Sequence, residues 1–278
     1  MFIAMVAGIY LALPMPAISQ ENTIRFSHPP QVTAQPLQLT LTPLAGGTIF
    51  YTTNGGIPGP AATVYSGPIT ITEPTVIRAR LFDTGGNPVG PVYTRSYIIA
   101  SYQQTIPVMS IATDWANLDA LHNFPKGKGR EWERPINLEY FAPGGTEAFN
   151  VAAGIRIHGN FSRLYSPKKS YRLYFRKVYG GPGRLDYPLF EDSEVHKFDK
   201  LVLRAGFQDS FLHRNIPGLS DKHHTAKYIS DQVTRNLHRD MGQPAAHGTW
   251  VLLYLNGQFW GLYNLTERID LDFFQSYS

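Results

Sequence analysis

Short runs in which apolar and polar residues alternate recur along most of the chain and predict β-strands. In the first third, three such runs are Thr48–Thr52, Pro68–Ile71 and Val76–Leu81. Clusters of Gly, Asn and Pro stand between them and predict tight turns. We therefore expect residues 29–100 to form a small antiparallel β-sandwich.

The rest of the chain predicts more strands, one helix and a hairpin. The helix is expected over residues 225–241, where apolar side chains recur on one face and Gly242 follows. Asp231 falls on the face away from this apolar stripe. Asn256-Gly257 joins two apolar runs and predicts a β-hairpin. The further strands expected are 136–141, 153–158, 171–176 and 200–204. This order predicts a β-rich α+β protein with two domains.

Composition agrees with two folded domains. The 278 residues are 43% hydrophobic, which is enough for a core, and the chain has no cysteine, which excludes disulfides and cysteine-ligated metals. Residues 29–100 carry five charged side chains and residues 101–278 carry thirty-nine. This shift predicts a domain boundary at a linker, residues 100–106, with the second domain at 106–278.

The amino terminus predicts export. An apolar run, Phe2–Leu13, precedes Pro14, Pro16 and the small-residue pattern Ala17-Ile18-Ser19, as in a signal peptide over residues 1–19. The alternative is a buried first strand or helix, because no Lys or Arg precedes the run. The run is too short to span a membrane and no later segment predicts a span, so we expect a secreted or cell-surface protein.

The first domain resembles a known module. Gly47–Gly55, Tyr65–Ile71 and Thr75–Arg80 together resemble the immunoglobulin-like domain at the carboxy terminus of chitobiase and β-hexosaminidase. The resemblance implies a spacer or attachment module of exported proteins. Exposed Tyr51 or Tyr65 would allow binding of cell-surface polysaccharide, although packing in the core is the role expected of such rings.

A basic interval is the main chemical feature of the second domain. Residues 148–185 hold eight Lys or Arg and no Asp or Glu. A turn at Gly159 lets backbone N–H groups approach a ligand, and a lysine entering the next strand suits phosphate oxygens. The alternatives are a solvated sheet face or non-specific binding of a polyanion. The chain has no nucleic-acid-binding motif, so no nucleic-acid partner is expected.

Four ordered segments then resemble the CotH (spore coat protein H) kinase family. They are Gly154–Asn160, Pro167–Arg172, Leu201–Gly206 with Asp209, and Asn256–Asp270. The resemblance implies an atypical protein-kinase-like fold that uses ATP and Mg or Mn to phosphorylate Ser or Thr of exported proteins.

By this resemblance, the segment 154–163 stands where a kinase covers the phosphates, and Lys169, or its neighbour Lys168, stands where a strand lysine meets them. Segment 264–267 stands where the hinge between kinase lobes binds adenine. The residues implied are Lys169, Lys168, Arg156, Arg163, Gly159 and Asn160 for ATP phosphates, Glu267 and Leu265 for adenine, and, as weaker assignments, Arg204 and Asp209.

The acidic residues of phosphoryl transfer are not found in the sequence. The family's Trp-Asp-x-Asp motif does not occur before Ser278, and Asp270 with Asp272 match the hinge continuation instead. His238-Arg239-Asp240 spells a kinase catalytic tripeptide but falls in the predicted helix, and His223-His224 reads as a polar loop. No catalytic or metal-binding residue is therefore assigned, and the kinase-like domain is expected to be incomplete.

Two functional hypotheses follow. The first is the nucleotide-binding half of an exported Ser/Thr kinase, inactive by itself, whose full-length parent transfers phosphate from ATP to an exported protein. The second is a non-catalytic surface adhesion or carbohydrate-binding protein.

Overall fold

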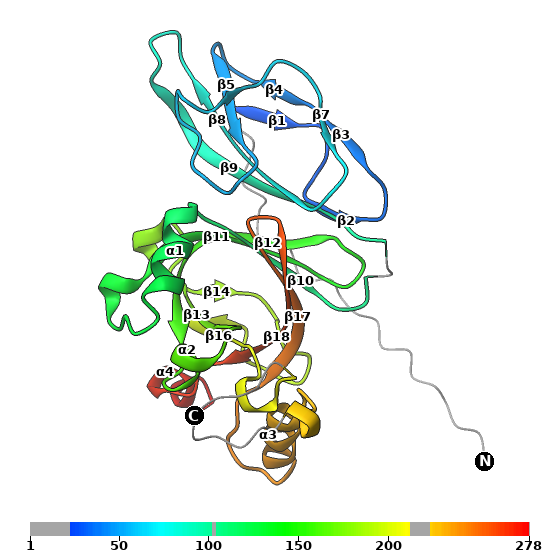
Figure 1. The fold of residues 1–278 in the computed structure, drawn as a ribbon, viewed down its shortest axis with the longest axis vertical. Coiled ribbons are helices and arrows are strands. Elements are labelled where there is room, and N and C mark those ends of the chain that lie inside the picture. The colour runs from blue at the N-terminus through cyan, green and yellow to red at the C-terminus, as the bar shows by residue number, and fades with distance from the viewer. Residues whose placement is uncertain (1–22, 102–103, 212–222, 278) are drawn as a thin grey trace, which may run out of the picture.

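The computed structural model describes residues 23–101, 104–211 and 223–277 and shows a β-sandwich followed by a β-barrel (Figure 1). This arrangement confirms the predicted β-rich α+β class. The expected signal peptide lies outside the described residues. Among the helices that the structure describes, none is long and apolar enough to cross a membrane.

The sandwich is built from nine short strands. Its largest sheet has the order β2-β9-β8-β5-β6, and β1 pairs with β4 and β3 with β7. The sandwich was expected to be antiparallel, yet β2 and β9 pair in parallel, which their long separation in the chain permits. The strands are β1 (Ile24–Phe26), β2 (Gln31–Thr33), β3 (Leu37–Leu39), β4 (Leu41–Pro43), β5 (Thr48–Thr52), β6 (Thr63–Val64), β7 (Ile69–Ile71), β8 (Thr75–Phe82) and β9 (Pro88–Ile99).

The second sheet closes on itself in the order β10-β11-β12-β13-β16-β18-β17. Closure depends on β10, which pairs antiparallel with β11 and parallel with β17. Two short strands, β14 (Leu185–Asp186) and β15 (Lys197–Phe198), pair outside the barrel. The barrel strands are β10 (Val108–Ala112), β11 (Arg134–Phe141), β12 (Glu147–His158), β13 (Ser170–Tyr174), β16 (Lys200–Arg204), β17 (Gly248–Leu255) and β18 (Gln258–Glu267).

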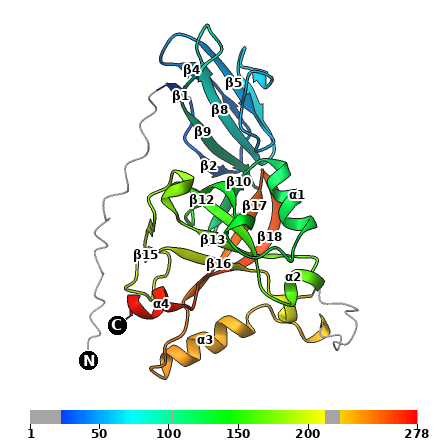
Figure 2. The ribbon, with the colours of Figure 1, turned by 90° about the vertical axis from the view of Figure 1, so that its left-hand side faces the viewer.

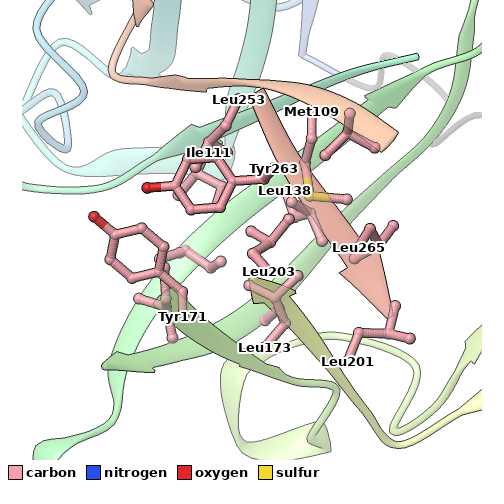
Figure 3. Close-up of a cluster of buried hydrophobic side chains, with 14 of the residues drawn as sticks. Met109, Ile111, Leu138, Tyr171, Leu173, Leu201, Leu203, Leu253, Tyr263 and Leu265 are labelled. Atoms are coloured by element: carbon pink, nitrogen blue, oxygen red, sulfur yellow. The ribbon is translucent and has the colours of Figure 1, made fainter. Parts of the chain in front are cut away.

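Alternation along these strands decides which side chains fill the barrel and which face outward. Ile155 and Ile157 of β12 are at most 2% exposed and belong to the interior core. Leu173 of β13 and Leu203 of β16 are fully buried in the same core (Figure 3). Their neighbours Arg156, His158, Arg172 and Arg204 therefore project from the outer surface. The basic interval thus becomes one outer face of the barrel.

The hairpin between β17 and β18 forms at the predicted dipeptide. Asn256 and Gly257 have φ angles of 48° and 82°, the left-handed values that a two-residue hairpin turn requires. The Asn256 side chain also accepts a hydrogen bond from the Thr113 N–H (2.9 Å) and donates one to its carbonyl (2.8 Å). These bonds fix the hairpin against the start of the barrel.

The helices lie outside the barrel, and α3 runs across the end opposite the sandwich (Figure 2). The α-helices are α1 (Trp115–Asn123), α2 (Ser162–Tyr165), α3 (Ser230–Asp240) and α4 (Leu271–Ser276). Short 3-10 turns occupy Arg130–Trp132, Lys177–Tyr179, Phe207–Asp209 and His223–Thr225.

Helix α3 is shorter than expected, and its apolar face points to solvent and not to the barrel. The predicted apolar stripe includes Val233, Leu237 and Met241, and these side chains are 45%, 55% and 66% exposed. The opposite, polar side contacts the sheet, where Arg235 donates to Asn264 Oδ1 (2.6 Å) and Asn264 donates to Gln232 Oε1 (3.1 Å). Hydrogen bonds, and not apolar burial, therefore attach this helix to β18.

The sandwich and the barrel are joined through buried polar groups. Ser96 of β9 is fully buried, and its N–H donates to Glu139 Oε1 of β11 (3.0 Å) while its hydroxyl contacts Glu139 Oε2 and Ser110 Oγ. Asn150 of β12 donates to the Thr94 carbonyl (3.0 Å). Paired buried polar groups require accurate geometry, so these bonds fix how the two domains meet.

Candidate functional site

A cavity of about 670 Å³ opens between the loop after β12, the end of β16 and the start of α3. Its size falls in the range of small-ligand sites. Each wall comes from a segment that strand or helix packing holds in place. The lining residues are His158, Gly159, Phe161, Ser162, Ser170, Arg204, Gly206, Phe207, Asp209, Tyr228, Ser230, Asp231, Trp250 and Asn264.

Gly159 makes the turn over the cavity. Its φ of +105° is a conformation that residues with a side chain rarely adopt, and a Cβ atom there would lie 2.2 Å from Ser162 Oγ. The loop therefore keeps its backbone close to the space below it. We expect Gly159→Ala to destabilise the protein by about 1–2 kcal/mol, as judged by chemical unfolding. An unchanged stability would contradict the strained turn.

An ion pair forms part of the cavity wall. Arg204, at the end of β16, lies with Nε 2.9 Å from Asp231 Oδ2 in the first turn of α3. Arg235 approaches the same carboxylate at 3.2 Å. The Arg204 and Asp231 side chains remain 43% and 50% exposed, so the pair by itself adds little stability and stays accessible to a ligand.

Asp209 organises the segment that leads into α3. Its carboxylate accepts hydrogen bonds from the N–H of Lys227 (2.7 Å) and of Ser230 (2.9 Å). Burial acts to raise the pKa of Asp209, but these hydrogen bonds outweigh it and hold the pKa below its ordinary value. Tyr228, between them, has a φ of 62°, which is uncommon for an aromatic residue and places its ring at the cavity wall.

His158 is a neutral hydrogen-bond donor at the same wall. Burial, followed by the charges of Arg172, Arg268, Arg204 and Arg163, lowers the pKa of His158 to about 3. Arg172 lies 3.0 Å from His158 Nδ1 and can only donate, so Nδ1 accepts and Nε2 carries the proton. His158 therefore offers an N–H group in a strongly positive environment.

These features together suit an anionic ligand. Asp209 and Asp231 are the carboxylates of the cavity wall, and both already accept hydrogen bonds or ion pairs. The neutral His158 and the guanidinium of Arg204 face the same space. A phosphate would meet donors and a positive potential, whereas a cation would meet like charges.

The two predicted phosphate lysines lie in the loop itself and do not line the cavity. Lys169 donates to the carbonyls of Arg163 (2.9 Å) and Ser166 (2.7 Å) and so closes the loop around its ammonium group. Lys168 donates to the Leu262 carbonyl and lies 4.3 Å from the centre of the Tyr263 ring. Burial lowers the pKa of Lys168 to about 8.

The predicted arginines and Asn160 are also placed outside the cavity. Arg163 is buried and donates to the carbonyls of Ile157 (2.8 Å) and Gly127 (3.0 Å), which fixes the base of the loop. Arg156 donates to the Gly129 carbonyl, and Asn160 is exposed. Of the predicted phosphate residues, Gly159 is thus the one at the cavity wall, joined by the weaker assignments Arg204 and Asp209.

The predicted adenine residues lie at the far end of β18. Leu265 is fully buried in the barrel core. The Glu267 carboxylate is buried and accepts hydrogen bonds from the His247 N–H (2.8 Å), His247 Nδ1 (2.9 Å) and the Tyr277 hydroxyl (2.8 Å). Both residues are used in packing, and their role with adenine stays a prediction.

Lys200 forms ion pairs with Asp199 and with two carboxylates that follow β18. Lys200 Nζ lies 2.8 Å from Asp199, 3.1 Å from Asp270 and 2.7 Å from Asp272. No group of three or more metal-liganding side chains occurs in residues 23–101, 104–211 and 223–277. Asp270 and Asp272 therefore anchor α4 to β16.

In the sandwich, Tyr51 and Tyr65 form an edge-to-face pair with centroids 6.4 Å apart and pack against the hydrophobic core. This is the packing role expected of them. No observation at these rings points to a sugar site.

Sequence reasoning missed Asp231, Tyr228 and His158. The predicted apolar stripe placed Asp231 on the exposed side of the helix, and the reversed orientation of α3 brings it to the cavity. A tyrosine with positive φ has no sequence signature. The sequence pattern that could have identified His158 is its alternation with the buried Ile157. This pattern places His158 on the same outward side of the strand as Arg156.

Comparison with known families matches both parts of the chain. Residues 29–94 match the chitobiase/β-hexosaminidase C-terminal domain, and residues 155–277 match the CotH kinase protein family. The CotH match begins inside β12 and includes the cavity, whereas β10 and β11 precede it. No curated protein matches the chain. The chain thus matches the chitobiase/β-hexosaminidase C-terminal domain in its first part and the CotH kinase protein model in its last part.

Proposed function

We propose that the cavity beneath Gly159 binds the polyphosphate of ATP and that the chain is the nucleotide-binding part of a CotH-type protein kinase. The CotH match suggests a kinase-like function. The observation that carries the finer proposal is the Arg204–Asp231 pair, which stands in the cavity between a strand and the following helix.

The order of elements supports this assignment. In protein kinases a glycine-rich loop covers the phosphates, and a lysine on the third strand pairs with a carboxylate of the next helix. Here the Gly159 loop joins β12 to β13, β16 is the third barrel strand counted from β12, and α3 is the next α-helix among the described residues. Arg204 would therefore take the place of the kinase lysine, and Asp231 would hold it toward the phosphates.

The residues of the cavity would bind and orient the nucleotide. Arg204 would neutralise phosphate oxygens, the His158 N–H would donate to them, and the loop at Gly159 would exclude water above them. Bound ATP would supply the phosphoryl group. Both cavity carboxylates are engaged by protein donors, so the described residues do not fit a divalent cation, and we derive no step through Mg or Mn.

The wider setting is part of the same proposal. The two matched families suggest an extracellular or surface protein. We propose Ser or Thr of an exported protein as the phosphate acceptor, with the sandwich as the module that spaces or attaches the kinase-like part.

Binding of a fluorescent ATP analogue tests the proposal. Arg204→Gln should weaken binding by roughly tenfold or more, because it removes a charge-assisted contact. Lys169→Ala should weaken it less, since the lysine ammonium is engaged by loop carbonyls. Arg25→Gln, an exposed arginine of the sandwich, is the matched control and should bind normally. Equal affinity of the Arg204→Gln variant and the control would refute the assignment.

A further inference from the structure

A second cluster of cations lies beside the cavity, on the outer face of β12, β13 and the end of β18. Arg156 and Arg172 stand directly opposite each other in the register of β12 and β13. Tyr174 lies two residues along β13, and the Arg156 and Arg172 guanidinium groups are 5.2 Å and 6.0 Å from its ring centre. Arg268 follows β18. We call Arg156, Arg172, Arg268 and Tyr174 the arginine face.

The charges of this face are poorly compensated. In the part of the chain that the structure describes, neither Arg156 nor Arg172 pairs with a carboxylate, and Arg268 reaches Asp270 only at 3.9 Å. The Nε atoms of Arg172 and Arg268 are buried and have no hydrogen-bond partner among the described residues. Burial, followed by the charge of Arg172, lowers the pKa of Arg268.

Such an arrangement is unfavourable in the protein alone. Like charges directly opposite on neighbouring strands destabilise a sheet, and buried donors without partners cost free energy. An anion bound across the face would relieve both penalties at once. Residues that oppose stability in this way are commonly kept for binding.

We propose that the arginine face binds a phosphomonoester carried by a Ser or Thr of the protein acceptor, next to the nucleotide cavity. Guanidinium groups pair bidentately with phosphate, and a dianion matches three neighbouring arginines better than a single carboxylate does. Arg156, Arg172 and Tyr174 do not line the cavity. The half-buried guanidinium groups of Arg156 and Arg172 lie over the buried Tyr174 ring, so the face is a separate outer surface that a group at the end of a protein side chain would reach.

Position links this face to the chemistry. Arg172 contacts His158 at 3.0 Å, and His158 lines the cavity, so one residue separates the two anion sites. This inference rests on the proposed kinase function, because a kinase of Ser and Thr makes the phosphomonoesters in question. A phosphate already placed on the acceptor would then hold a neighbouring hydroxyl near the nucleotide.

The experiment compares a phosphoserine peptide, the same peptide without phosphate, and inorganic phosphate. Arg268→Gln should weaken binding of the phosphopeptide by roughly tenfold or more and leave binding of the fluorescent ATP analogue unchanged, because Arg268 does not line the cavity. Arg204→Gln should do the reverse. Arg25→Gln, which removes the same charge from the sandwich, should change neither.

Three results would overturn the proposal. The first is equal binding of the two peptides, and the second is competition by inorganic phosphate at the concentrations at which the phosphopeptide binds. The third is a loss of nucleotide binding in Arg268→Gln equal to that in Arg204→Gln, which would make the face part of the cavity. A chain that binds the phosphopeptide but no nucleotide would instead refute the proposed function and leave this anion site standing.

Thermal unfolding distinguishes a loss of phosphopeptide binding from a loss of stability of the variant. Arg172→Gln removes the repulsion from Arg156, so the melting temperature of the unliganded variant should equal or exceed that of the wild type. The phosphopeptide should raise the melting temperature of the wild type but not of the Arg268→Gln variant. A lower melting temperature of the unliganded Arg172→Gln variant would show that Arg172 serves packing and not binding.

Discussion

Glu267→Ala should lower the free energy of unfolding by about 2–4 kcal/mol, because it strips three donors of their buried acceptor. The two N–H groups of His247 and the hydroxyl of Tyr277 all point at this carboxylate. The variant would take the acceptor from the His247 N–H groups where water has little access, since the Glu267 and His247 side chains are 4% and 7% exposed. The more exposed Tyr277 hydroxyl would keep its contacts with Ser193 Oγ and His247 Nδ1. Chemical denaturation measures the loss directly.

The same variant separates packing from nucleotide binding at Glu267. Below its unfolding transition, the Glu267→Ala protein should bind the fluorescent ATP analogue as the wild type does, because Glu267 does not line the cavity. Glu194→Ala removes an exposed carboxylate and is the matched control, with no expected effect on either measurement. Near-normal stability with lost nucleotide affinity would instead support the adenine role that the sequence resemblance implies.

The strands were predictable because their signals are local. Alternation along 153–158 follows from burying one side of β12, and Asn256-Gly257 is a dipeptide whose left-handed preference fixes a hairpin by itself. Each of these signals depends on a few neighbouring residues. The structure therefore confirms them to within a few residues.

Closure of the barrel was not predictable in the same way. Strand β10 is buried along its whole length, so it has no alternation, and its parallel partner β17 follows more than a hundred residues later. The sequence predicted strands and a helix of a kinase-like domain and did not indicate how the sheet would close. A continuous apolar run does not say which distant strand it will join.

The candidate site depended on the orientation of one helix. An apolar stripe normally faces the core, and this rule assigned Asp231 to solvent. In the structure, Gln232 and Arg235 bind Asn264 of β18, the stripe is exposed, and Asp231 reaches Arg204. Hydrogen bonds between residues 29 and 32 positions apart decided the outcome, and such bonds leave no periodic signal in a sequence.

Raising the pH from 6 to 9 should destabilise the joint between the sandwich and the barrel. Glu139 is 1% exposed, and burial, followed by the nearby charge of Glu147, raises the pKa of Glu139 to about 8, against the hydrogen bonds from Ser96 and the charge of Arg95. Arg95 pairs with Glu147 at 3.8 Å. One arginine thus faces two carboxyls, and the folded protein keeps a proton on this pair.

The raised pKa of Glu139 makes the folded protein less stable as the pH rises. The folded protein binds this proton more tightly than the unfolded chain, in which the pKa of a Glu is near 4.5. The contribution is therefore fully present below about pH 4.5 and is lost as the pH rises toward 8. A loss on the order of a few kcal/mol is expected, because each pKa unit corresponds to about 1.4 kcal/mol.

Glu139→Gln imitates the protonated carboxyl and should remove most of this dependence. Gln has nearly the same shape, can accept from the Ser96 N–H through its oxygen, and carries no charge to bury. Thermal unfolding from pH 6 to 9 should show a falling melting temperature for the wild type and for the exposed control Glu194→Gln, and a nearly flat one for Glu139→Gln. Parallel curves for all three proteins would mean that Glu139 is already ionised in the joint, and that Arg95 and Ser96 suffice to hold its charge.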